Sequence, residues 1–222
     1  MTEHMEWSLL ATLDEAERDA LLATTRRRAF GKGEVVVHEG DPADSLHLVE
    51  SGMLAVRVTT ADGDSATLNV LGPGSYFGEL SLLDGHVPTR SATVVALEPA
   101  VTRVLPASGF AELRRRHRAA EQLLLTLLAR RVEELSSRLL EVMYDGLDRR
   151  VFRRLHELAE LYAESSGPVT VPVTQELLAE LVGGTRPSVN QVLQRLVARG
   201  VVELGRGRVT VTDRGWLADQ SR

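Results

Sequence analysis

The sequence contains no cysteine and no long uninterrupted apolar run. Without cysteine, the chain cannot form disulfide bridges, thiolate zinc sites or cysteine-ligated iron–sulfur clusters. No segment approaches the roughly 18 consecutive apolar residues that suggest a membrane-spanning helix, and residues 1–6 lack the basic start of a secretory signal. We therefore expect a cytoplasmic protein with no membrane partner.

The chain also lacks an overall excess of positive charge, because 26 basic and 31 acidic residues give the 222-residue chain a net charge of -5. The distribution is uneven. From residue 148 onward, 11 arginines and 9 acidic residues give +2, whereas the preceding part has 15 basic and 22 acidic residues, giving -7. DNA binding requires a local basic surface rather than a basic chain. The C-terminal third is therefore the part of the chain that could bind DNA.

The N-terminal half reads as a β-structure. From residue 30 to about 105, short apolar or alternating runs such as Val35-Val36-Val37 are separated by glycines and other turn residues. Many short strands joined by regular turns predict an antiparallel barrel or roll. Residues 7–24 have apolar positions at helical spacing, which predicts short helices before the strands.

Residues 110–145 contain no internal glycine or proline, which predicts one long helix. Its apolar residues step alternately by three and four, as in a heptad seam: Leu125, Leu128, Val132, Leu135, Leu139 and Val142. A helix packed on its own domain is the alternative, but the length of the seam and its flanking charges favour a two-chain coiled coil. We expect a homodimer, with a hinge near Asp145-Gly146.

A window beginning at Gln175 fits a helix-turn-helix. The small Ala179 lets two helices cross closely, and Gly183 accepts the positive φ of the turn. Val189 and Val192 would fasten the second helix to the core. The hairpin predicted at 201–211 would form a wing, so the segment reads as a winged helix-turn-helix.

The second helix of this motif would present polar side chains suited to the major groove. Arginine pairs with guanine, and asparagine or glutamine pairs with adenine. A solvated polar face would show the same residue types, but the motif favours recognition by Arg186 and Gln191. Thr174 and Thr185 are predicted helix N-caps. The candidate DNA-binding residues are Thr174, Gln175, Thr185, Arg186, Ser188, Asn190, Gln191, Arg206 and Arg208.

One stretch of the roll carries a specific chemistry. Residues 72–80 read Gly-Pro-Gly-Ser-Tyr-Phe-Gly-Glu-Leu, and residues 88–93 read Pro-Thr-Arg-Ser-Ala-Thr. Free backbone N–H groups, a hydroxyl and a lone arginine can enclose a phosphate, while a nearby carboxylate can accept a bond from a sugar hydroxyl. Cyclic nucleotides offer both groups.

With these motifs, the sequence resembles the cyclic-AMP receptor protein and fumarate-nitrate regulator (Crp/Fnr) superfamily of bacterial transcription regulators over essentially its whole length. The resemblance implies an α+β chain with a sensor β-roll of the jelly-roll type at 1–109, a long dimerisation helix and hinge at 110–146, and a winged helix-turn-helix at 147–222. It also implies cyclic AMP or a related cyclic nucleotide as effector, with no metal. The partners it implies are double-stranded DNA with a palindromic operator, a second copy of the chain, and RNA polymerase.

The resemblance also implies roles for individual residues. Gly78 and Ser91 would contact the phosphate, Arg90 would balance its charge, and Glu79 would bind the ribose 2′-hydroxyl. Members that sense other signals tend to lack the Arg-Ser pair, which favours a cyclic nucleotide here. The candidate ligand-binding residues are Gly78, Glu79, Leu80, Arg90, Ser91, Leu135 and Ser136.

Two departures from the family pattern limit what carries over. Family members that bind cyclic AMP usually place two polar residues on the long helix to bind the adenine, but here the pair reads Leu135-Ser136. One missing neutral hydrogen bond costs about 0.5–1.5 kcal/mol, so base selection should be relaxed. In the recognition helix, Pro187 and Gln191 replace a base-reading carboxylate and arginine, so we expect a different operator sequence.

Three alternatives remain open. A regulator of the same family could sense haem or a gas through a histidine ligand. It could also act without a ligand, with Arg90 paired internally to a carboxylate. More distantly, a small roll could be a cupin metalloenzyme using His38, His47, His86 and Glu79, although the close His-x-His pair of such sites is missing. We expect a regulator rather than an enzyme.

Overall fold

The computed structural model describes residues 7, 10, 13–59, 65–83, 89–116, 118–163 and 167–221. The chain divides into two compact units, which are described separately. One comprises Met1–Ser65 and Asn69–Leu135, and the other comprises Ala66–Leu68 and Ser136–Arg222. Two residues named above, His86 and Pro88, lie outside the described residues. Within the described part, no helix is long and apolar enough to cross a membrane.

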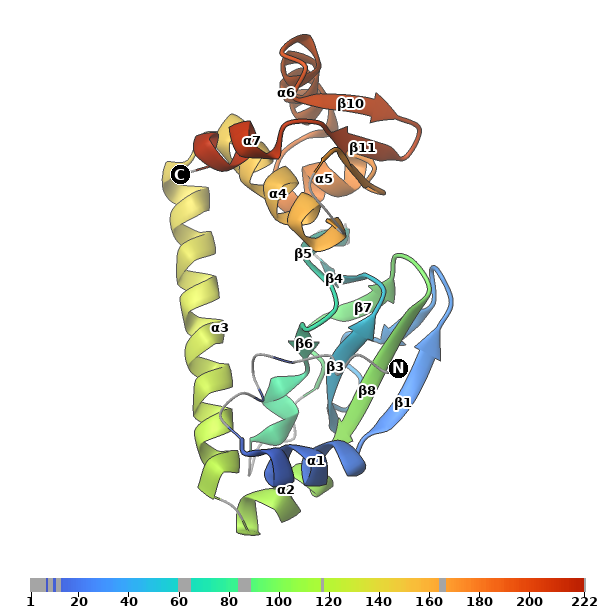
Figure 1. Ribbon diagram of the computed structural model, residues 1–222, viewed down its shortest axis with the longest axis vertical. Coiled ribbons are helices and arrows are strands. Elements are labelled where there is room, and N and C mark those ends of the chain that lie inside the picture. Colours follow the sequence, from blue (N-terminus) through green and yellow to red (C-terminus); the bar gives the residue numbers. More distant parts are fainter. Residues whose placement is uncertain are drawn as a thin grey trace. The chain divides into compact units, whose positions relative to one another are not determined.

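The first unit contains the predicted roll, built from two four-stranded sheets (Figure 1). The first sheet has the order β1-β8-β3-β6, formed by Arg26–Phe30, Ala100–Pro106, Ser45–Ser51 and Tyr76–Phe77. The second has the order β2-β7-β4-β5, formed by Val35–Val37, Thr93–Ala96, Leu54–Thr59 and Ser65–Leu71. Of β5, the residues Ala66–Leu68 are the ones grouped with the other unit. Successive strand residues point to opposite faces, so Val94 and Ala96 of β7 are buried while Val95 is only partly covered.

Among the described residues, three α-helices belong to the first unit, and the last of them continues into the second unit. α1 (Glu15–Ala23) begins with a capping box, in which the Asp14 side chain accepts from the Glu17 backbone and the Glu17 side chain accepts from the Asp14 backbone. α2 (Ala107–Arg116) follows β8, and α3 (Arg118–Tyr144) is the long helix. The long helix predicted for 110–145 is present as α3, but it begins at Arg118, and residues 107–116 form the separate helix α2. Phe110 on α2 and Leu127 on α3 both lie in one core.

The far part of α3 leaves its apolar seam uncovered. Leu128 still packs against the core of the roll. Beyond it, the side chains of Val132, Leu139 and Val142 are 62%, 60% and 65% exposed, respectively. The predicted seam is therefore a solvent-exposed apolar stripe in the single chain.

The second unit contains the predicted helix-turn-helix and wing, preceded by a helix and a strand. Its elements are α4 (Leu147–Tyr162), β9 (Val169–Val171), α5 (Gln175–Val182), α6 (Arg186–Ala198), β10 (Val202–Gly205), β11 (Arg208–Val211) and α7 (Arg214–Gln220). The three strands form one sheet in the order β10-β11-β9. Its core includes fully buried side chains from each of the longer helices: Val151, Leu155, Leu178, Val189 and Leu193.

Two details at the start and end of this unit do not follow from the sequence patterns above. The N-cap position of α4 is Gly146, and Asp148 lies in the first turn. There its carboxylate accepts two bonds from Arg195 of α6, at 2.6 and 2.7 Å. The final helix α7 was not predicted at all.

Candidate functional site

The loop before the short helix η2 (Glu79–Leu82) turns sharply at Gly78. This residue has φ of 84°, in the left-handed region that favours glycine. A Cβ atom there would lie 2.4 Å from Arg90 Nη1 and 2.7 Å from the Ser45 carbonyl oxygen. The hydroxyl of Ser81 donates to the Gly78 carbonyl at 2.7 Å. Glycine is therefore required both by the backbone and by the close approach of the arginine.

Arg90 is the charged centre of this loop and is only 6% exposed. Its Nη1 donates to the Ser45 carbonyl at 2.8 Å, and its Nη2 donates to the Ser45 hydroxyl at 3.0 Å. The Asp44 carboxylate lies 3.7 Å from Nη2, but that side chain is 86% exposed, so water screens the pair. Nε is buried and has no hydrogen-bond partner among the described residues.

The electrostatic surroundings leave this arginine cationic. Burial lowers the pKa of Arg90, while the carboxylates of Asp44, Asp41 and Glu79 act in the opposite direction. An arginine side chain stays protonated at any physiological pH. Within the described part of the chain, Arg90 is thus a buried cation with one unused donor, Nε, and its nearest carboxylate, that of Asp44, is exposed to water, so this loop has the chemistry of an anion site.

The side chain of Glu79 connects the loop to α3. It is largely buried, and its Oε1 lies 3.6 Å from Nε of Arg131. Leu135 and Ser136 follow Arg131 by four and five residues on the same helix, and both are exposed. Ser91 and Leu80 are exposed as well. The structure thus brings Gly78, Glu79 and Arg90 together, while the roles of these four exposed residues stay predictions.

A buried histidine lies behind the loop, in β3. The ring of His47 stacks on Phe77 with centroids 4.6 Å apart, and its Nδ1 lies 3.1 Å from the Thr102 hydroxyl. Burial, followed by the positive charges of Arg90 and Arg28, lowers the pKa of His47 from 6.5 to about 3. The ring is therefore neutral near pH 7. No group of three or more His, Asp or Glu residues suited to a metal ion occurs within the described ranges.

We expect Gly78→Ala to destabilise the first unit more than Gly74→Ala does. Both glycines have φ of 84°, so alanine at either position costs roughly 1–2 kcal/mol in backbone strain. Nothing lies within 4 Å of a Cβ at Gly74, whereas a Cβ at Gly78 would displace Arg90. Overpacking raises the expected cost at Gly78 to roughly 2–5 kcal/mol. Urea unfolding of the two variants measures the difference, and equal losses would show that Arg90 does not constrain this corner.

In the second unit, the predicted helix-turn-helix geometry is present. Thr174 caps α5 by accepting from the Leu177 N–H at 3.1 Å, and Gly183 closes the helix with φ of 60°. Thr185 caps α6 by accepting from the Ser188 N–H at 3.3 Å. The two hydroxyls of Thr185 and Ser188 are also 2.9 Å apart, which partly occupies the Ser188 side chain.

The two faces of α6 differ as the sequence predicts. Val189, Val192 and Leu193 are buried against the rest of the unit. Arg186 and Gln191 are exposed on the other face, and Ser188 and Asn190 are partly covered. The sequence predicts which side chains are buried and which are exposed because an α-helix has 3.6 residues per turn, so one face recurs at that spacing.

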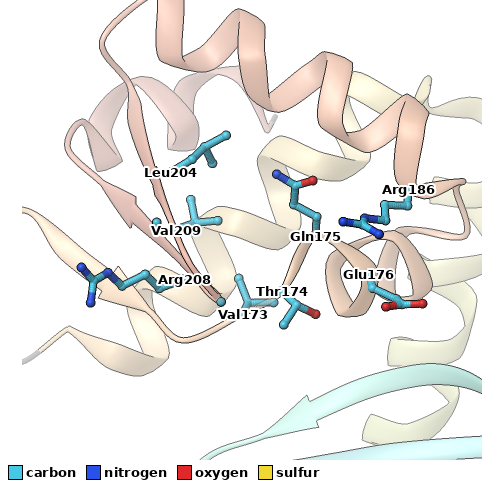
Figure 2. Close-up of a pocket in the computed structure, with 10 residues that line it drawn as sticks. Val173, Thr174, Gln175, Glu176, Arg186, Leu204, Arg208 and Val209 are labelled. Atoms are coloured by element: carbon cyan, nitrogen blue, oxygen red, sulfur yellow. The ribbon is translucent and has the colours of Figure 1, made fainter.

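A hollow of about 350 Å³ lies where α5, α6 and the wing meet (Figure 2). Arg186 and Gln175 border it from the helices, and Arg208 borders it from the wing (Figure 2). Glu176 also lines it, on the side of Arg186, and no motif marked this residue. Arg206 is exposed in the turn of the wing. The complete lining is Val173, Thr174, Gln175, Glu176, Arg186, Leu204, Gly205, Gly207, Arg208 and Val209.

Sequence reasoning missed the residues that hold Arg90 and Glu79. Ser45 and Asp44 lie at the start of β3, about 45 positions before Arg90, and Arg131 lies on α3. None of the three belongs to a local pattern. Their roles follow only from contacts between distant parts of the chain.

Comparisons with known proteins agree with this architecture. Residues 27–117 match the family model of the cyclic nucleotide-binding domain, and residues 149–220 match the Crp-like helix-turn-helix domain. The chain is 33% identical over 214 residues to a CRP-like cAMP-activated global transcriptional regulator of Mycobacterium tuberculosis, covering 93% of this chain and 94% of that protein. It is 34% identical over 203 residues to a cyclic AMP receptor protein of Thermus thermophilus, covering 91% of each.

Solved structures show the same fold. FixK2 from Bradyrhizobium japonicum superposes with a TM-score of 0.77 at 18% identity, covering 89% of this chain and 98% of that one. A sensor roll joined to a winged helix-turn-helix defines a class of DNA-binding transcription regulators, not of enzymes. Within that class, the chain belongs to the Crp/Fnr superfamily.

Proposed function

We propose that this regulator binds DNA as a dimer and that a cyclic nucleotide, cyclic AMP in the first place, controls its DNA affinity. The observation that carries the effector is the buried, cationic Arg90, whose Nε has no partner among the described residues and which lies against Gly78. The printed names of the Mycobacterium tuberculosis and Thermus thermophilus relatives give cyclic AMP as the effector of those proteins. These names support the same effector class here.

In the proposed complex, the cyclic phosphate is held by Arg90 together with Gly78 and Ser91. Glu79, which already faces α3 through Arg131, accepts from the ribose 2′-hydroxyl. Leu80 completes the loop, and Ser136 binds the base beside Leu135. Because a leucine cannot donate or accept a hydrogen bond, selection between adenine and other bases is relaxed.

Titration calorimetry of the purified protein with cyclic AMP, cyclic GMP and cyclic di-GMP tests the effector. Saturable binding of cyclic AMP at micromolar concentration or below supports the proposal. Binding of none of the three would contradict it and would leave the DNA-binding assignment intact. A visible absorption spectrum of the same sample identifies the haem-sensing alternative, because bound haem would give the sample strong visible absorption.

The dimer is proposed from the uncovered stripe on α3. Burying apolar surface away from water contributes roughly 25 cal/mol of stability per Å². A stripe of exposed apolar side chains at heptad spacing is therefore expected to be covered by a partner helix. The stripe consists of Leu125, Val132, Leu135, Leu139 and Val142. A second copy of the same helix matches this pattern along its whole length.

We expect Leu139→Asp to dissociate the dimer and Leu140→Asp to leave it intact. The two leucines are neighbours with similar exposure, 60% and 56%, but only Leu139 lies on the seam. A carboxylate at the seam would be buried without a partner, so the dimer dissociation constant should rise at least about 100-fold. Sedimentation equilibrium measures this change, and equal effects of the two variants would contradict a coiled-coil dimer.

The DNA-bound state is proposed from the second unit. Arg186 and Gln191 of α6 would read guanine and adenine in the major groove, with Asn190 and Ser188 beside them. Phosphates would lie along the hollow bordered by Thr174, Gln175 and Arg208. Thr185 and Arg206, which do not line the hollow, would add further contacts to the DNA. A two-fold dimer requires a palindrome with half-sites roughly 34 Å apart. RNA polymerase is the expected protein partner, and the cytoplasm is the expected compartment.

We propose that the effector acts through α3. Ligand bound near Glu79 and Ser136 would change the packing of the seam and reorient the DNA-binding part about Asp145-Gly146. Such control requires that the ligand bind the DNA-competent state more tightly than the other state.

A further inference from the structure

The unforeseen helix α7 packs on α4 within the second unit. Leu217 is fully buried, and the Trp216 ring meets Phe152 of α4 edge to face with centroids 5.2 Å apart. Asp213 caps the helix by accepting from the Trp216 N–H at 2.9 Å. None of these residues belongs to the proposed ligand site or to the proposed DNA-contacting set.

Arg153 joins three segments at one point. Its Nη1 donates to the Asp145 carboxylate at 2.8 Å and lies 3.2 Å from the Glu141 carboxylate, both near the end of α3. Its Nε and Nη2 both donate to the Ser221 carbonyl, which follows α7, at 3.2 and 2.8 Å. Arg149 adds a second bond to Asp145 at 3.2 Å. The corner between α3 and α4 is therefore tied to the C-terminal end of the chain.

The other side of α7 touches the end of the recognition helix. Arg199, the C-cap residue of α6, lies over the Trp216 ring at 5.5 Å from its centroid. Arg214 pairs with Glu160 of α4 at 3.2 Å. One short helix thus contacts α4 directly, meets the end of α6 through Trp216, and is tied to the end of α3 through Arg153.

We propose that Arg153 and α7 form a clasp that fixes the α3–α4 corner and positions the recognition helix relative to it. Glu141, Asp145 and Ser221 are the acceptors of this clasp. Rotation about Asp145-Gly146 requires Arg153 to release the two carboxylates or the Ser221 carbonyl. The release of Arg153 during rotation rests on the hinge of the proposed function. The clasp itself can be tested without ligand or DNA.

Hydrogen exchange of the protein, followed by mass spectrometry, tests the clasp. The reporters are the amides of Asp145 and Arg150, which donate to the Glu141 and Gly146 carbonyls at 3.0 and 3.2 Å. Arg153→Gln removes the charge and the fork of donors, and a chain ending at Asp213 removes α7. We expect exchange at 141–150 to rise about tenfold in Arg153→Gln and further in the shortened chain. Exchange within α5 and the first unit should stay unchanged in Arg153→Gln.

Arg195→Gln is the matched control. It removes an equally close arginine–carboxylate pair, with Asp148, that involves neither α3 nor α7. The clasp is contradicted if exchange at 141–150 is unchanged in Arg153→Gln. It is also contradicted if Arg195→Gln raises that exchange equally, or if the rise in Arg153→Gln spreads evenly over the second unit. A failure of cyclic AMP to bind would overturn the proposed effector without altering any of these readings.

Discussion

Arg90→Ala is expected to weaken cyclic AMP binding at least about 100-fold, as measured by titration calorimetry. Hydrogen bonds to charged groups contribute about 1.5–3 kcal/mol each, and a 100-fold loss corresponds to about 2.8 kcal/mol. Arg90 is buried, is held in place by Ser45 and has one donor unused, so its geometry is set before the ligand arrives. An anion that meets a preorganised cation pays little to order it.

The control for this variant is Arg27→Ala in the same unit. Arg27 is 61% exposed and pairs with Glu50 on the surface of the roll. We expect its removal to leave cyclic AMP affinity within about twofold, because exposed pairs contribute little. If Arg90→Ala binds cyclic AMP as tightly as the unchanged protein, the phosphate is held elsewhere. Arg90 would then be a purely structural residue, and the alternative of a regulator without a ligand would gain support.

The first unit is expected to lose stability steeply in acid because of His47. Its folded pKa of about 3 lies below the unfolded value of 6.5, so the unfolded chain binds a proton that the folded chain does not. The free energy of unfolding therefore falls as the pH drops below 6.5 and continues to fall until about pH 3. At about 1.4 kcal/mol per pH unit, the loss is roughly 2–3 kcal/mol at pH 4.5 and roughly 4 kcal/mol at pH 3.

His47→Gln isolates this contribution, since glutamine does not titrate. Urea unfolding at pH values between 7 and 4 should show a much flatter pH dependence in this variant than in the unchanged protein. His38→Gln is the control, because His38 is exposed on the roll. A slope that is the same in His47→Gln as in the unchanged protein would show that another group causes the acid sensitivity.

The helix-turn-helix could be predicted almost residue by residue, and physical reasons explain why. Its N-caps, Thr174 and Thr185, and its turn residue, Gly183, are residue types preferred at those positions. The buried face of α6 follows from the helical period of 3.6 residues. The roll was predictable only as a class of fold. Which strands pair, as in β1-β8-β3-β6, depends on contacts between residues far apart in sequence.

The parts that could not be predicted share one cause. The apolar pattern of 110–145 runs on without interruption, yet α2 and α3 are separate helices whose Phe110 and Leu127 share one core, and such tertiary packing leaves no local signal in the sequence. The partners of Arg90 come from β3, and those of Arg153 come from the ends of α3 and of the chain. Arginine contacts of this kind leave no periodic signal in a sequence. The predicted boundaries at 109 and 146 stay predictions.

DNA affinity measured with and without cyclic AMP is the most direct test of the whole account. Fluorescence anisotropy on a palindromic duplex, selected from random sequence in the presence of protein and cyclic AMP, gives both values at one salt concentration. The account predicts at least about tenfold tighter binding with cyclic AMP, a coupling of about 1.4 kcal/mol, and no such gain for Arg90→Ala. Equal affinity with and without cyclic AMP, in a protein that demonstrably binds it, would contradict the claim that the roll controls the DNA-binding domain.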